Sequence, residues 1–219
     1  MNFVFLGAPG SGKGTQAAML AEKLKIKTIS TGEALRKEVL LQSEIGKDAK
    51  SYMDSGHLVP DNVVVGIIKK QLTEGDCDTG FILDGFPRNI KQAEDLGEML
   101  LLIGKKIDIV FDFQVAEEVL IKRIAGRFSC KNCSAVYNRY FKVLKKEGIC
   151  DECRSNQFDS RSDDNEVTVI NRLKVYHNST APLIEYYKKI HLLLPIDAIK
   201  SAPLVFEELV GAIRKASIQ

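Results

Sequence analysis

The sequence lacks long hydrophobic runs, and it lacks a strong excess of charge of either sign. Its longest apolar runs, at residues 99–103 and 192–196, are far shorter than the roughly 20 residues that a membrane-spanning helix needs. The net charge is +2 for 219 residues, so the charge balance indicates neither a nucleic-acid partner nor a membrane partner. A hydrophobic fraction of 45% at this charge excludes a disordered chain. We therefore expect a soluble globular protein.

The N-terminal segment lacks the features of a secretory signal. Residues 1–7 carry no basic stretch and no cleavage site, and their apolar character predicts a first strand. We therefore expect a cytoplasmic location, which is a reducing compartment. In such a compartment the five cysteines are more often metal ligands or plain thiols than disulfides.

Short apolar segments alternate with segments of helical periodicity. Strands are predicted at residues 2–6, 27–30, 81–83, 107–113 and 192–196. Helices are predicted at residues 13–24, 32–41, 61–72, 90–102, 116–125, 165–189 and 204–215. This alternation predicts an α/β fold, a doubly wound parallel sheet with helices on both faces.

Two segments interrupt the alternation and are predicted to be inserts. Residues 126–164 have no helical period and hold four of the five cysteines. In residues 30–59 two short helical patterns replace a single crossover helix. We therefore expect a core domain of residues 1–29, 60–125 and 165–219, from which both inserts project.

A glycine-rich loop lies between the first strand and the first helix. Its sequence is Gly7-Ala8-Pro9-Gly10-Ser11-Gly12-Lys13-Gly14-Thr15. Glycines let the backbone curl so that its N–H groups face phosphate oxygens, and the following helix adds its positive end. The alternative is a plain glycine-rich turn, but the position between strand and helix favours a P-loop in which Lys13 reaches the phosphates.

A magnesium ion is expected beside this loop. The strict P-loop pattern has Ser or Thr directly after the lysine, whereas Gly14 stands there in this chain. The ion is therefore expected to be held mainly by the phosphates and by water. Asp84 closes a buried strand, where an acidic residue orients Mg²⁺; the alternative is that it caps the following turn.

Four cysteines have the spacing of a structural zinc site. Cys130 and Cys133 form one C-x₂-C pair, and Cys150 and Cys153 form the other after sixteen residues. Four thiolates complete a tetrahedron with no open position, so such a site stabilises the fold and does no chemistry. The alternatives are two disulfides or a zinc ribbon that binds nucleic acid. The expected reducing location argues against the first.

Seven motifs resemble those of the adenylate kinases and follow the order of that family over nearly the whole chain. They are GAPGSGKGTQ at residues 7–16, STGEALR at 30–36, GHLVP at 56–60, FILDGFPR at 81–88, GR at 126–127, RSDD at 161–164 and TAPL at 180–183. The resemblance implies a P-loop NTPase-type fold with a zinc-binding lid at 126–164, like the lids of certain bacterial members, and a small helical insert at 30–59 that binds the nucleoside monophosphate. It implies Mg²⁺-dependent transfer of a phosphoryl group between ATP and AMP, with ADP as product, by a monomer.

The resemblance also implies the roles of individual residues. The residues implied to bind ATP are Gly10, Ser11, Gly12, Lys13, Gly14, Thr15, Arg123, Arg127, Val136, Tyr137 and Lys200. Those implied to bind AMP are Thr31, Arg36, Val59, Gly85, Arg88, Gln92, Arg161 and Arg172. Catalysis is assigned to Lys13, Asp84, Arg88, Arg123, Arg127, Arg161 and Arg172. Arginine suits this role because its planar fork bonds two phosphate oxygens and keeps its charge.

Three of these assignments have open alternatives. Gln92 is implied to read the adenine base of AMP, because an amide both donates and accepts hydrogen bonds, or it is an exposed helix residue. Tyr137 binds ATP or belongs to the lid core. Arg123 and Arg127 lie four residues apart, so they share one helix face if the helix extends that far.

The residues leave three alternative functions open. They are a kinase for CMP or UMP, which Gln92 disfavours, a P-loop switch or nucleic-acid-binding zinc protein, and a general ATPase. Neither nucleic acid nor a membrane is expected as a partner.

Overall fold

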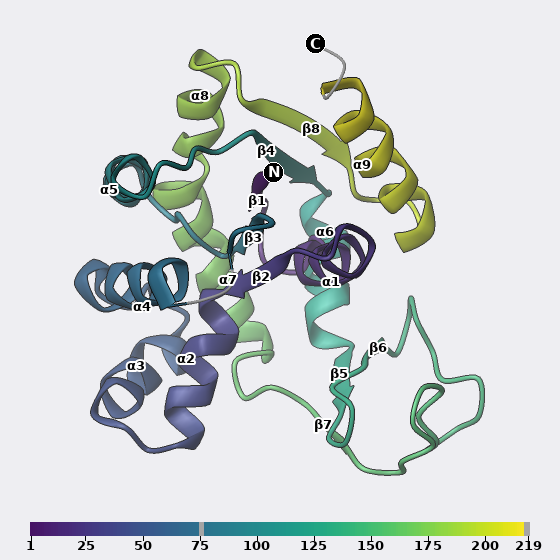
Figure 1. Ribbon diagram of the computed structural model, residues 1–219. Coiled ribbons are helices and arrows are strands. Elements are labelled where there is room, and N and C mark those ends of the chain that lie inside the picture. Colours follow the sequence, from purple (N-terminus) through teal and green to yellow (C-terminus); the bar gives the residue numbers. More distant parts are fainter. Residues whose placement is uncertain (75–76, 217–219) are drawn as a thin grey trace.

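The computed structural model describes residues 1–74 and 77–216. Within them, a parallel sheet of five strands forms the centre of the molecule (Figure 1), in the order β2-β3-β1-β4-β8. The strands are β1 (Asn2–Leu6), β2 (Lys27–Ser30), β3 (Phe81–Asp84), β4 (Ile109–Gln114) and β8 (Leu193–Asp197). The predicted α/β class with a parallel P-loop-type sheet is confirmed.

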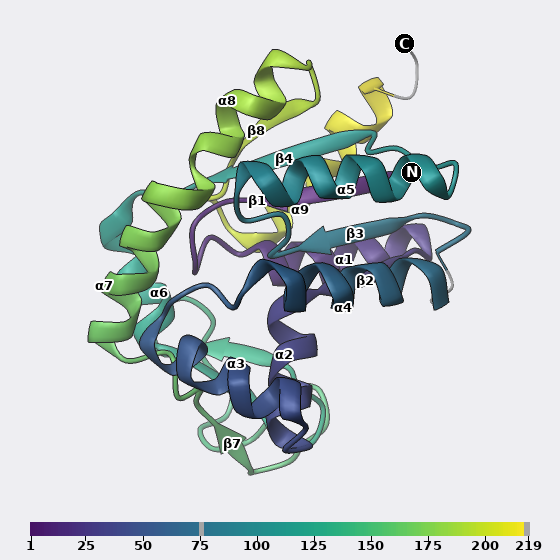
Figure 2. The same ribbon diagram turned by 90° about the vertical axis from the view of Figure 1, so that its left-hand side faces the viewer.

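Helices cover both faces of this sheet. On one face lie α1 (Lys13–Leu24) and α9 (Ala202–Ala216), which pack on Phe3 and Phe5 of β1. On the other face lie α4 (Asp61–Glu74), α5 (Ile90–Leu102) and α8 (Pro182–Lys189), against Val4 and Leu6 (Figure 2). Successive β1 residues therefore enter two different cores, and for that reason the strand reads as a continuous apolar run.

Each insert forms a small lobe of its own. The first contains α2 (Thr31–Leu40) and α3 (Glu44–Ser55), whose N-termini are capped by the hydroxyls of Ser30 and Ser43. The second contains β5 (Arg127–Cys130), β6 (Val136–Asn138) and β7 (Phe158–Asp159), which form an antiparallel sheet in the order β6-β5-β7. In Figure 1 the first lobe lies at lower left and the second at lower right.

The prediction of one continuous helix at residues 165–189 is wrong in the middle of this range. The structure has α7 (Glu166–Val175), a π-helical turn η1 (Tyr176–Thr180) and then α8. Pro182 has no N–H group to continue the α-helical ladder, and its ring crowds the preceding turn. The chain widens instead, and Ala181 N–H donates to Tyr176 O at 2.8 Å.

The helix before the lid ends before Arg127, so it does not carry both Arg123 and Arg127. It is α6 (Glu117–Ala125), and Arg127 is already the first residue of β5. The condition for Arg123 and Arg127 to share one helix face, a helix that extends to Arg127, is therefore not met. Among the described residues, no helix is long and apolar enough to cross a membrane.

Candidate active site and metal centre

The glycine-rich loop takes a conformation that only glycine adopts readily. Gly10 and Gly12 have φ values of 82° and 97°, in the left-handed region. A Cβ atom on Gly10 would lie 2.7 Å from Ile124 Cγ1. No side chain caps the N-terminus of α1, unlike α2 and α3, so its first N–H groups stay available for an anion.

The side chain of Lys13 is folded onto this loop. Its Nζ donates to Gly7 O at 2.6 Å and to Ala8 O at 2.9 Å. Burial lowers the pKa of Lys13 to about 8, and the charge of Asp84 opposes this shift. The charges of Arg88, Arg172 and Arg127 lower the pKa further.

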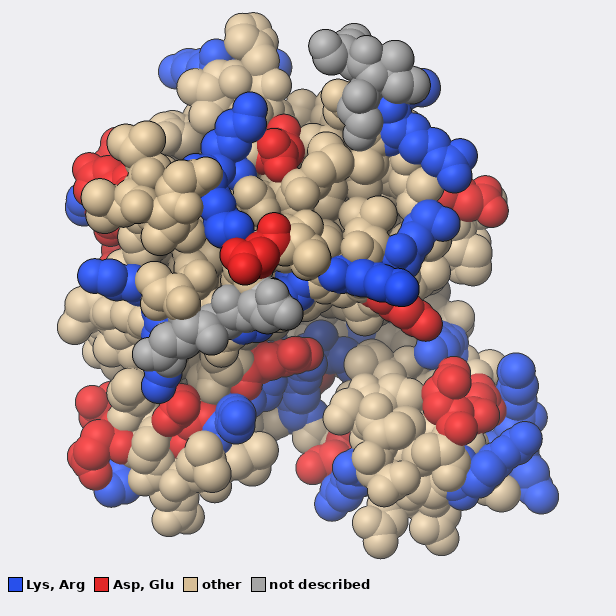
Figure 3. All heavy atoms as spheres, in the orientation of Figure 1, with Lys and Arg blue, Asp and Glu red and all other residues tan. Residues whose placement is uncertain are grey.

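A pocket opens next to α2, separate from the P-loop; we call it the second pocket, the P-loop being the first site. Thr31, Arg36, Val59, Arg88 and Gln92 line it, and the wall is completed by Gly32, Leu35, Met53, Gly56, His57, Leu58, Val64, Asp163 and Arg172. In Figure 3 the hollow between the two lower lobes shows Lys and Arg side chains in its depth. Six of the eight residues assigned to AMP binding line this pocket, whereas Gly85 and Arg161 are not among its lining residues.

The turn after β3 positions Arg88. Thr31 Oγ1 and Arg88 Nε both donate to Gly85 O, each at 2.8 Å. Thr180 Oγ1 donates to Arg88 O at 2.8 Å. Burial is the main cause that lowers the pKa of Arg88, followed by the charge of Arg172, so this guanidinium lies in an electropositive, partly dry environment.

Gln92 is buried inside the second pocket, with an exposed fraction of 1%. Its Oε1 accepts from Arg88 N–H at 2.7 Å, and its Nε2 donates to Asp61 Oδ1 at 2.6 Å. The alternative that Gln92 is an exposed helix residue is therefore wrong.

Two acidic residues hold arginines of the site in place. Arg127 Nε donates to Asp164 Oδ2 at 2.7 Å, and Arg172 Nη1 donates to Asp163 Oδ2 at 2.8 Å. Both carboxylates belong to the RSDD motif, in which sequence reasoning assigned only the arginine. Burial, with the nearby charge of Arg127, lowers the pKa of Arg161. The two carboxylates thus hold Arg127 and Arg172 by ion pairs.

Arg123 and Lys200 lie at the far edge of the site, where α6 meets the segment after β8. Arg123 donates to Ala198 O at 2.9 Å and to Ile199 O at 3.2 Å, and its guanidinium lies 5.5 Å from the ring centre of Phe141. The Lys200 side chain is exposed and bonds Glu208 at 2.8 Å. Arg123 therefore contacts the backbone just before Lys200, whereas the Lys200 side chain is bonded to Glu208.

The side chain of Tyr137 belongs to the core of the second lobe. It is 1% exposed, and its ring stacks on Phe128 at 5.7 Å and meets Phe158 at 6.1 Å. Its hydroxyl lies 3.3 Å from Cys150 Sγ. Of the two alternatives, this structure favours the lid core, whereas Val136 beside it is 39% exposed.

Two carboxylates lie in strands beside the P-loop, Asp84 at the end of β3 and Asp112 inside β4. Asp84 is the last residue of β3, and one of its oxygens lies 3.4 Å from where a Cβ of Gly14 would stand. Asp112 of β4 is 2% exposed, and burial raises its pKa. Sequence reasoning missed Asp112, because a single acidic residue in an apolar strand carries no signal of its own.

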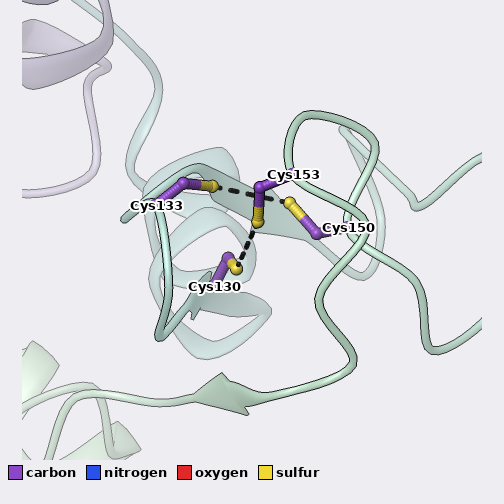
Figure 4. Close-up of side chains that lie close together, drawn as sticks. All are labelled: Cys130, Cys133, Cys150 and Cys153. Atoms are coloured by element: carbon purple, nitrogen blue, oxygen red, sulfur yellow. Dashed lines mark hydrogen bonds between the residues drawn. The ribbon is translucent and has the colours of Figure 1, made fainter.

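The four lid cysteines form one cluster (Figure 4). Their Sγ atoms all lie within 4.8 Å of one another, with 3.5 Å between Cys130 and Cys153 and 3.6 Å between Cys133 and Cys150. Tetrahedral zinc with Zn–S bonds of about 2.3 Å needs S···S distances of about 3.8 Å. The thiols therefore fit a metal ion. A disulfide, at about 2.05 Å, is much shorter than these separations.

A comparison with protein families agrees with this geometry. The family model described as adenylate kinase matches residues 5–192. The chain belongs to the adenylate kinase family. It is thus an enzyme of the nucleoside monophosphate kinase class, as the motifs predicted.

Individual adenylate kinases are similar over nearly their full length. The adenylate kinase of Archaeoglobus fulgidus is 48% identical over 98% of this chain and 99% of its own. That of Thermodesulfovibrio yellowstonii is 46% identical over 98% and 100%, respectively. That of Caldicellulosiruptor saccharolyticus is 51% identical over 89% and 90%. The predicted resemblance to adenylate kinases with a four-cysteine lid is therefore confirmed.

Proposed function

We propose that the protein transfers a phosphoryl group reversibly between Mg·ATP and AMP, giving two ADP. The observation that carries this proposal is that the P-loop and the neighbouring pocket adjoin at the end of β3. An oxygen of Asp84 lies 3.4 Å from where a Cβ of Gly14 would stand, and the next residue, Gly85, accepts hydrogen bonds from Thr31 and Arg88 of the pocket. A donor phosphate in the loop and an acceptor phosphate in the pocket would meet between Lys13 and Arg88.

In this proposal ATP occupies the P-loop and AMP occupies the second pocket. Thr31, Val59, Gly85 and Gln92 surround the AMP nucleoside, and Arg36 and Arg88 grip its phosphate. Val136 and the backbone at Tyr137 and Lys200 contact the nucleoside of ATP. Arg123 and Arg127 bind the ATP phosphates, and Arg161 and Arg172 bind the transferred group.

Catalysis then needs positioning and positive charge but no nucleophilic side chain. A phosphate oxygen of AMP attacks the γ-phosphorus in line, and the bond to the β-phosphate oxygen breaks. Lys13 and the arginines stabilise the charge that spreads over the phosphoryl oxygens. Asp84 would help to hold the Mg²⁺ ion, which would supply positive charge to the phosphates.

The two inserts are proposed to close over the core, as a lid of residues 126–164 and a flap of residues 30–59. Closure would exclude water and so prevent ATP hydrolysis. In the structure Arg127 is held by Asp164, so nucleotide phosphates must replace that partner as the lid closes. We propose that lid opening limits turnover. Single-turnover chemistry no faster than steady-state turnover would contradict this.

The metal in the lid is proposed to be Zn²⁺, held by all four cysteines. Thiolate ligands in tetrahedral arrangement suit this ion, and four protein ligands leave no position for a substrate. The metal would therefore stabilise the lid and take no part in phosphoryl transfer. The enzyme is further proposed to be a cytoplasmic monomer. Sedimentation of the purified protein measures its oligomeric state.

An acceptor screen tests the main proposal. Purified protein is given Mg·ATP with AMP, CMP, UMP or GMP in turn, and ADP formation is followed with a no-acceptor control. Turnover with AMP alone supports the proposal. Turnover with CMP or UMP keeps the reaction but overturns the base, and phosphate release without any acceptor contradicts kinase function.

Binding of ATP without AMP should take up a proton at pH 8 to 9. In the free protein the pKa of Lys13 is lowered to about 8, so the amine is largely neutral above that pH. Nearby phosphate favours the charged form and raises the pKa again. Calorimetry in two buffers of different ionisation enthalpy measures the uptake, which should vanish near pH 6.5. Lys13→Met should remove this contribution; equal uptake by that variant would contradict its assignment to Lys13.

A further inference from the structure

A network of hydrogen bonds surrounds the side-chain amide of Gln92. Asp61 is the first residue of α4, and its Oδ1 accepts from Gln92 Nε2 at 2.6 Å. Asn89 Nδ2 donates to both Asp61 oxygens, at 3.2 and 3.1 Å. On the other side of the amide, Arg88 N–H donates to Gln92 Oε1 at 2.7 Å.

This network allows only one orientation of the amide. The Arg88 backbone offers a donor and needs an acceptor, whereas the Asp61 carboxylate offers only acceptors and needs a donor. Rotating the amide of Gln92 by 180° would place donor against donor and oxygen against carboxylate. Gln92 is 1% exposed, so water cannot readily repair either mismatch.

Each protein contact leaves half of the amide free. The amide nitrogen has two N–H groups and the amide oxygen has two lone pairs, so one donor and one acceptor remain for a ligand. Their order in space follows from the orientation that Asp61 and Arg88 impose.

We propose that Asp61 is a specificity-determining residue that makes the acceptor site select a 6-amino purine over a 6-oxo purine. This proposal rests on the proposed function, in which Gln92 faces the base of the acceptor. Adenine presents an acceptor at N1 and a donor at its 6-amino group. Hypoxanthine and guanine present a donor at N1–H and an acceptor at O6, the reverse pattern. The reverse pattern needs the rotated amide, which the carboxylate of Asp61 opposes.

The test compares AMP with inosine monophosphate (IMP) as acceptor, because these differ at the 6-position and N1 only. Asp61→Asn keeps the shape but offers an N–H group that can donate to a rotated Gln92 oxygen. The ratio of kcat/KM for AMP to that for IMP should fall by about tenfold to a hundredfold, the range for one hydrogen bond to a charged group. Asp95→Asn is the matched control; this residue pairs with Lys91 on the surface of α5, and its ratio should stay unchanged.

A double-mutant cycle shows whether Asp61 acts through Gln92. In a Gln92→Leu background, Asp61→Asn should leave the AMP to IMP ratio unchanged, since no amide remains to be oriented. Partial unfolding lowers both kcat/KM values together and does not move their ratio. If the asparagine variant fails to fold, Asp61→Ser, which also removes the carboxylate, should shift the ratio in the same direction.

Three results would overturn the inference. An unchanged ratio in folded Asp61→Asn or Asp61→Ser would show that Arg88 N–H alone orients the amide. An equal shift with and without Gln92 would show that Asp61 acts by another route. No turnover of AMP by the wild-type protein would instead reject the proposed function, and this inference with it.

Discussion

Replacing Lys13 with methionine should lower kcat for the reaction of ATP with AMP by about 10²- to 10³-fold, the usual cost of removing one positioned charge from a transition state. The ammonium group lies at the carbonyls of Gly7 and Ala8, on the loop that holds the donor phosphates. Burial makes its charge costly in the free protein, as its lowered pKa shows. In a low-dielectric site the same charge interacts strongly with phosphate.

The measurement is steady-state kinetics at saturating ATP and AMP, with a thermal melt of each variant to check folding. Lys91→Met is the matched control, because that side chain is 68% exposed and pairs only with Asp95 among the contacts described for its end group. It should keep kcat within about twofold, as expected for substitution of an exposed surface side chain. A folded Lys13→Met enzyme with near wild-type kcat would refute the proposed role of the P-loop lysine.

Removing the metal should unfold the lid and leave the core folded. The buried cluster of the lid is small and consists of Cys130, Tyr137 and Cys150, with Phe128, Leu144 and Phe158 among the side chains packed on it. About forty residues with so little core need an additional source of stability. Structural zinc supplies on the order of 10 kcal/mol in small domains that depend on it.

Hydrogen exchange with mass spectrometry measures this effect directly. After chelation, amides in residues 126–164 should exchange at least about a hundredfold faster, because the unfolded lid no longer protects them from solvent. Amides of β1 and β4 should stay protected, because the core remains folded. Cys150→Ala should give the same pattern without chelator, and Cys77→Ala, a buried cysteine outside the lid, should not. Unchanged lid exchange after verified metal loss would show that the lid folds without metal. Sensitivity to reductant, but not to chelator, would favour the disulfide alternative.

Local patterns in the sequence predict much of the fold without any information on contacts between distant residues. The helices at residues 13–24 and 90–102 and the strands at 2–6 and 27–30 have the predicted bounds. The apolar patterns at 13–24, 90–102 and 2–6 are strong, whereas that at 27–30 is weaker, and glycine, asparagine or charged residues mark several of their ends. The P-loop and the two C-x₂-C pairs are likewise local patterns, because their chemistry depends on spacing along the chain.

Other features depended on contacts between distant residues. The π-helical turn within 165–189 precedes Pro182, and Thr180 at its end donates to Arg88 O, 92 positions away in the sequence. The aromatic stacking of Tyr137 on Phe128 needs β5 and β6 to be paired, which no local pattern specifies. Sequence reasoning therefore left open whether Tyr137 faced a ligand or the lid core.

The sequence by itself determined the fold class, the phosphate-binding loop, the cysteine cluster and the family, because these are written in short motifs and in periodicity. Only the tertiary structure decided which partners hold the functional side chains. Asp61 meets Gln92 across 31 positions of sequence, and Asp164 meets Arg127 across 37. Hydrogen bonds and charges act over a few ångströms in space, and such distances between remote residues exist only once the chain has folded.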